Sequence, residues 1–193
     1  MARATNRSGL PNERSSTALL ILDMVSRFDF PDGEATARAA RRIAPHIARL
    51  KERIRAAHFR VIYVNDNPGR WRSDAPALLR EAAAPDSRGA AVLDALRPTK
   101  EDYFILKPRH SAFFATPLAT ILESLGTRCV ILTGVSSHQC VLFTANDAHV
   151  RQFELVVPSD CIGAPSATDT RLAISYFRRA LGAAVIPQSR WRA

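Results

Sequence analysis

The chain has 193 residues, a formal net charge of +9, 47% hydrophobic and 23% charged residues, a composition typical of one soluble globular domain. No apolar run approaches the roughly 20 residues of a membrane span, and residues 1–17 lack the apolar region of a secretory signal. Three cysteines at unrelated spacings predict no disulfide framework, so we expect a cytoplasmic protein. The arginines are spread without interleaved aromatic residues, which argues against a nucleic-acid partner.

Short β-type runs alternate with helical segments along the chain. The expected strands are 17–23, 60–66, 102–107, 128–134, 153–160 and 183–187. The expected helices are 34–59, 117–126, 138–152 and 167–182, with one or two short helices within 67–98. This alternation predicts an N-terminal arm (1–16) and a single α/β domain (17–193). We expect its sheet to be doubly wound, mainly parallel and six-stranded, with helices on both faces.

Two residues predict how individual helices behave. Pro45 should kink the helix 34–59 or mark a start within it. Gly126 should end the helix 117–126, because glycine tolerates the left-handed conformation found after many helices.

Three segments that leave predicted strands carry reactive side chains: Asp23, Lys107 and Cys140. Functional groups of parallel α/β sheets collect at the carboxyl ends of strands. There, a lysine and a helix N-terminus would favour a thiolate, and an aspartate could accept the thiol proton. Each residue also has a simpler interpretation: Asp23 as a loop cap, Lys107 as a surface lysine and Cys140 as a small buried side chain. Their meeting at one edge favours a nucleophilic site, whereas Cys129 and Cys161 are interpreted as structural.

Five stretches together resemble the isochorismatase-like cysteine hydrolases, the superfamily of nicotinamidases and N-carbamoylsarcosine amidases. They are ALLILDMVSRFDF, VIYVNDNPGRW, LKPRHSAFFATPL, ILTGVSSHQCVLFTANDAHVR and LVVPSDCIGA, within about residues 16–187. The resemblance implies a catalytic triad of Asp23, Lys107 and Cys140. It also implies homo-oligomers, dimers or tetramers.

The resemblance further implies a special geometry before the cysteine. A non-proline cis peptide bond is expected between Val135 and Ser136. The backbone N–H groups of Ser136 and Cys140 would then form an oxyanion hole for a tetrahedral intermediate. Members commonly have Thr/Ala and Asn/Asp where this chain has Ser137 and His138.

No cofactor or catalytic metal is predicted. Metal-binding nicotinamidases have an Asp-x-His element after the second strand, but this chain has VNDNPGRW there, and its five histidines show no ligand spacing. Nucleotide-binding glycine motifs and the G-x-S-x-G elbow are absent from the sequence. The expected partner is therefore a small-molecule substrate, with nicotinamide disfavoured.

The predicted function is hydrolysis of a small amide-like or ureide-like C–N bond through a thioester. Isochorismatases proper cleave a vinyl ether without a cysteine nucleophile, so Cys140 favours C–N cleavage. Two alternatives stay open: vinyl-ether hydrolysis that uses Asp23 without a covalent step, and a non-catalytic basic interaction protein on the same fold.

The pocket prediction rests mainly on aromatic residues near the expected site. The candidate lining residues are Phe28, Phe30, Trp71, His110, Phe114 and His138. For each of these residues, a position in the core or at an oligomer contact is an equally good interpretation. Arg70 or Arg72 could hold a substrate carboxylate, although a solvated surface arginine is the favoured interpretation.

Overall fold

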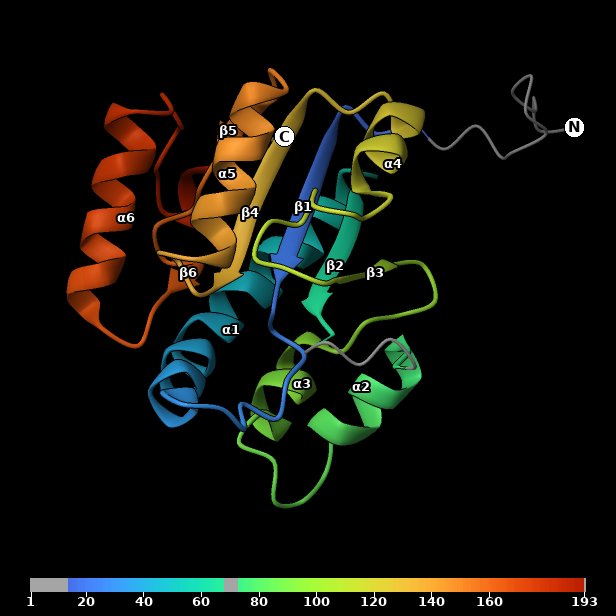
Figure 1. The fold of residues 1–193 in the computed structure, drawn as a ribbon. Helices are drawn as coiled ribbons and strands as arrows, with labels where there is room; N and C mark the ends of the chain where they lie inside the picture. The colour runs from blue at the N-terminus through green and yellow to red at the C-terminus, as the bar shows by residue number, and fades with distance from the viewer. Residues whose placement is uncertain (1–13, 68–72, 193) are drawn as a thin grey trace, which may run out of the picture.

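The computed structural model describes residues 14–67 and 73–192, and their strands form one parallel α/β sheet (Figure 1). The strands are β1 (Thr17–Leu22), β2 (Arg60–Asp66), β3 (Tyr103–Lys107), β4 (Cys129–Val135), β5 (Glu154–Val156) and β6 (Ile162–Gly163). The helices are α1 (Gly33–Ala56), α2 (Ala75–Ala82), α3 (Ala90–Leu96), α4 (Leu118–Leu125), α5 (Cys140–Val150), α6 (Ala167–Arg179) and the short 3-10 helix η1 (Gln188–Arg190). The strand order is β3-β2-β1-β4-β5, with β6 paired to β4. The predicted fold class is therefore confirmed.

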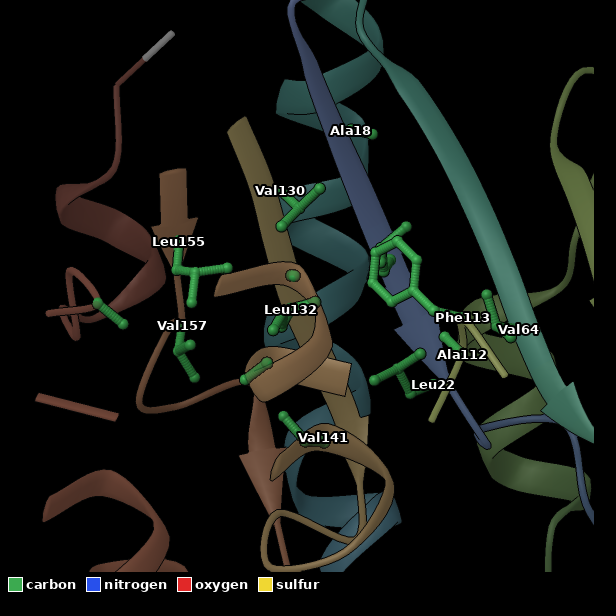
Figure 2. Packing of buried hydrophobic residues seen from close by; sticks show 14 of the residues in the cluster. Ala18, Leu22, Val64, Ala112, Phe113, Val130, Leu132, Val141, Leu155 and Val157 are labelled. Atoms are coloured by element: carbon green, nitrogen blue, oxygen red, sulfur yellow. The ribbon is translucent and has the colours of Figure 1, made fainter. Parts of the chain in front are cut away.

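The sheet separates two hydrophobic cores. Successive residues of a strand point to opposite faces, so Ala18, Leu20 and Leu22 of β1 join one core, while Leu19 and Ile21 join the other. Helices α4, α5 and α6 cover the first face, and α1, α2 and α3 cover the second. Figure 2 shows the first core, where apolar side chains of the strands meet those of α5 and of the segment before α4. Because β1 is buried throughout, it reads as a continuous apolar run in the sequence.

One of the two alternatives given for Pro45 is ruled out, and one predicted strand is corrected. Helix α1 runs without a break from Gly33 to Ala56, with Pro45 inside it, so no new helix starts at the proline. The segment 183–187 is not a strand, because only Ala184 forms a bridge, to Val156. Ala184 and Ile186 accept hydrogen bonds from the N–H groups of Val157 and Ser159, so the segment runs beside β5 without forming a regular strand. The sixth strand is instead β6, which extends the pairing of β4 beyond the end of β5.

The end of helix α4 matches the prediction. Helix α4 ends at Gly126, which has a left-handed φ of 68°.

Among the described segments 14–67 and 73–192, no helix combines the length and apolar character that a bilayer crossing requires.

Candidate functional site

The three candidate catalytic residues meet at the carboxyl edge of the sheet. Asp23 directly follows β1, Lys107 is the last residue of β3, and Cys140 is the first residue of α5. The Lys107 Nζ atom lies 2.9 Å from Asp23 Oδ2 and 3.4 Å from Cys140 Sγ. Lys107 is fully buried, and Cys140 is 9% exposed. The lysine thus bridges a carboxylate and a sulfur that are far apart in the sequence.

Neighbouring strand β2 holds the aspartate in place. The Asp23 N–H donates to the carbonyl of Val64 at 3.0 Å. Its Oδ1 accepts a hydrogen bond from the backbone N–H of Asp66 at 2.7 Å. Asp23 also has a positive φ of 53°, a conformation that aspartate tolerates better than most residues. One carboxylate oxygen is therefore anchored to the backbone, and the other faces Lys107.

The charges of the site favour an ammonium and a thiol at rest. Burial alone would lower the pKa of Lys107, but the Asp23 carboxylate and the Cys140 sulfur outweigh it, so this pKa is raised. Burial and the Asp23 carboxylate raise the pKa of the Cys140 thiol, and Lys107 offsets only part of that increase. The direction of this shift favours the thiol at neutral pH, and the transfer of its proton to Asp23 stays a prediction. A reaction at this sulfur would therefore need a base that removes the proton.

A tight turn leads from β4 to the cysteine. Gly134 has a φ of 111°, and a Cβ atom there would lie 2.1 Å from the carbonyl oxygen of Leu22, so a side chain does not fit. The next peptide bond, Val135–Ser136, is cis. Helix α5 begins at Cys140, and the first N–H groups of a helix have no acceptor within it.

A cavity of about 630 Å³ opens onto these residues. Asp23, Ser136 and Cys140 form part of its wall, which suits a small-molecule ligand. The cavity lies at the carboxyl edge of the sheet, where ligands of parallel α/β folds bind.

The structure brings some of the predicted pocket residues to this cavity and leaves others away from it. Phe28, Phe30 and His110 line it. Phe114 and His138 are not among the lining residues; Phe114 is 55% exposed on the surface. The predicted Trp71, like Arg70 and Arg72, lies outside the described residues.

Several lining residues were not predicted from the sequence. They are Val25, Ser26, Arg27, Asp29, Thr36, Asn65, Asp66, Leu78, Glu81 and Gln139. Asn65 and Asp66 end β2 at the same edge as Asp23, so their positions at a strand end are a sequence signal for the cavity. The remainder come mainly from the loop after β1 and from α2. Their positions at the cavity depend on tertiary packing, so no local sequence pattern predicts them.

Within the part of the chain that the structure describes, no three His, Cys, Asp or Glu side chains are grouped so that they could hold a metal ion.

Comparisons with known proteins agree with this fold. The family model described as "Isochorismatase domain" matches residues 17–189. The isochorismatase family protein YaaI of Bacillus subtilis is 38% identical over 172 residues, which are 89% of this chain and 94% of YaaI. The ureidoacrylate amidohydrolase RutB of Methylorubrum extorquens is 27% identical over 77% of this chain and 70% of its own. The crystal structure of N-carbamoylsarcosine amidase from Thermoplasma acidophilum has a TM-score of 0.70 and 28% identity, covering 92% of this chain and 99% of that one. From this family match and the shared fold, the chain belongs to the isochorismatase family and is a hydrolase.

Proposed function

We propose that the protein hydrolyses the C–N bond of a small amide or ureide, with Cys140 as the nucleophile. The observation that carries this proposal is the position of Lys107 Nζ, 2.9 Å from Asp23 Oδ2 and 3.4 Å from Cys140 Sγ, at a cavity of about 630 Å³. Two relatives, RutB and N-carbamoylsarcosine amidase, are named as amide-cleaving enzymes, which supports the C–N bond as the target.

In the first half of the reaction, the Asp23 carboxylate takes the proton from the Cys140 thiol as sulfur attacks the substrate carbonyl carbon. The negative charge of the tetrahedral intermediate falls on the former carbonyl oxygen, which accepts hydrogen bonds from the N–H groups of Ser136 and Cys140. The C–N bond then breaks, and Asp23 returns the proton to the leaving nitrogen. Lys107 remains an ammonium throughout and stabilises the sulfur while it is negative.

In the second half, water attacks the thioester, or the thiocarbamate when the substrate is a ureide. Asp23 accepts a proton from the water, the C–S bond breaks, and the departing sulfur takes this proton back. The acid is released, and the site returns to its resting protonation state. The raised pKa of the thiol fits this order, because the proton leaves sulfur only during the attack.

The direct test measures turnover of a panel of primary amides, N-carbamoyl amino acids and ureides. Ammonia release and chromatography are the two readouts. We expect Cys140→Ala to lose activity by about 10⁴-fold or more. The matched control is Cys161→Ala, because Cys161 is equally a free, buried cysteine but does not line the cavity. It should retain wild-type turnover of the same compounds.

Other results would support the alternatives. Retained turnover in Cys140→Ala with lost turnover in Asp23→Asn would indicate acid catalysis of the vinyl-ether type, without a covalent step. Absence of turnover across the panel, together with an unreactive Cys140, would favour a binding protein on the same fold.

A further inference from the structure

Asn65 lies near the end of β2. Among the described residues, its side-chain nitrogen has a hydrogen-bond partner and its side-chain oxygen has none. The residue is 2% exposed. Its Nδ2 donates a hydrogen bond to the carbonyl oxygen of Val25 at 2.8 Å. Since that carbonyl can only accept, the amide group must present its nitrogen there. The opposite atom, Oδ1, is therefore fixed as an acceptor pointing away from Val25.

The Oδ1 atom is buried and has no hydrogen-bond partner among the residues that the structure describes. Buried side-chain oxygens nearly always have a partner, so an exception calls for a physical explanation. Asn65 lines the same cavity as Asp23 and Cys140. An acceptor left open on the wall of a ligand cavity is completed when a ligand supplies a donor.

Two other small polar side chains of this cavity already have partners within the protein. The Ser26 hydroxyl oxygen accepts from the N–H of Phe28 at 2.9 Å, and the Thr36 hydroxyl donates to the carbonyl of Asp32 at 3.0 Å. Asn65 Oδ1 is thus a neutral acceptor without a partner among the described residues, and it belongs to a residue that lines the same cavity as Cys140.

We propose that Asn65 is a specificity-determining residue: its Oδ1 accepts a hydrogen bond from the N–H of the carboxamide or ureide group that Cys140 attacks. This inference rests on the proposed function and sharpens its substrate class to groups that carry at least one N–H. An ester or a vinyl ether has no such donor, and its binding would leave Oδ1 unpaired. A site built to hydrogen-bond an N–H discriminates strongly against analogues that lack it.

A purely structural role for Asn65 would make a different prediction. If the side chain served only to hold Val25, its replacement would change stability and reactivity in the same way for every ligand. The useful measurement is therefore a ratio between a probe with N–H groups and a probe without them.

The experiment alkylates the protein at pH 8 with 2-iodoacetamide, which has a carboxamide, and with iodoacetonitrile, which has no N–H. Peptide mass spectrometry gives the rate constant at Cys140 for each reagent, and the ratio of the two constants is divided by the ratio for glutathione. We expect this normalised ratio to be about 10 in the wild type. In Asn65→Leu, which keeps the side-chain size, it should fall to about 1. The control Thr133→Val removes a buried hydroxyl of β4 that does not line the cavity, and it should keep the wild-type ratio.

Each outcome is decisive. An unchanged ratio in folded Asn65→Leu overturns the role of Asn65, even if that variant is less stable. If Asn65→Leu does not fold, the wild-type ratio decides alone, because a value near one overturns the proposal. If neither reagent modifies Cys140 faster than Cys129 and Cys161, the nucleophile itself fails. That result rejects the proposed function and is distinct from labelling with an unchanged ratio.

Discussion

Two buried lysine–aspartate pairs lie at opposite ends of β3, and they differ in what surrounds them. At the carboxyl end, Lys107 pairs with Asp23 at 2.9 Å and also contacts the Cys140 sulfur. Before the amino end, Asp102 pairs with Lys51 of α1 at 3.4 Å. Both lysine side chains are at most 5% exposed. Burial of a Lys–Asp pair is therefore not enough to mark a functional site.

The pair at the amino end is closed by other protein groups. Lys51 Nζ donates to the Tyr63 hydroxyl at 2.8 Å and to the carbonyl of Arg97 at 3.0 Å. Asp102 accepts from Arg55 at 2.7 Å and from the N–H of Thr99 at 2.8 Å. Burial dominates here, and the pKa of Lys51 is lowered. At the carboxyl end the pKa of Lys107 is raised, and a cavity adjoins the pair.

We call Lys107–Asp23, which adjoins the cavity, the open pair, and Lys51–Asp102 the closed pair. The largest expected effect is the loss of the base Asp23 from the open pair. Asp23→Asn keeps the shape of the side chain but cannot accept the thiol proton, so kcat/KM should fall by about 10⁴-fold. The matched variant at the closed pair is Asp102→Asn, whose folded fraction should keep the wild-type kcat/KM. Steady-state kinetics with active-site titration compares the two, and equal losses would remove the functional distinction between the pairs.

Next in size is the loss of stability at the closed pair. Lys51→Met leaves the buried Asp102 with one cation fewer, so the free energy of unfolding should drop by about 3–5 kcal/mol. Urea denaturation followed by circular dichroism measures this change. Unchanged stability would mean that Arg55 alone is sufficient to compensate Asp102.

The same replacement at the open pair should act mainly on catalysis. In Lys107→Met the sulfur loses its neighbouring ammonium, and we expect kcat/KM to fall by about 10²–10³-fold. If instead the variant is fully active, Lys107 has only a structural function, like Lys51.

A smaller, pH-dependent effect concerns Asp66, the other carboxylate next to Asp23. Burial, reinforced by the Asp23 charge and opposed by Lys107, raises the pKa of Asp66. The folded protein then holds this proton to a higher pH than the unfolded chain, so stability falls as pH rises from the ordinary carboxyl value to the raised one. Asp66→Asn should lack this fall, so urea midpoints from pH 3.5 to 6.5 should show the wild type losing stability relative to the variant. A constant difference between the two proteins would contradict the raised pKa.

The sequence predicted strands β1 to β4 and the edge at which the candidate triad meets, because both follow from local patterns. The apolar run of β1 and the alternation of strands and helices are visible without tertiary information. The closed pair was not predicted, since nothing near Lys51 in the sequence indicates that Asp102 packs against it. The raised thiol pKa of Cys140 also escaped prediction, because it depends on burial depth. Asn65 was noted only as part of a stretch without histidine, and its open acceptor atom becomes visible only beside the cavity.

Strand β3 lies at one end of the sheet order, and among the described residues β2 is its only strand neighbour, yet it supplies Lys107. Edge strands are held on one side only, so they can detach in a local opening that leaves the central strands in place. Such an opening would withdraw the ammonium from the sulfur while most of the secondary structure persists. Heating should then abolish turnover before the circular dichroism signal changes, so an edge strand would set the thermal limit of activity.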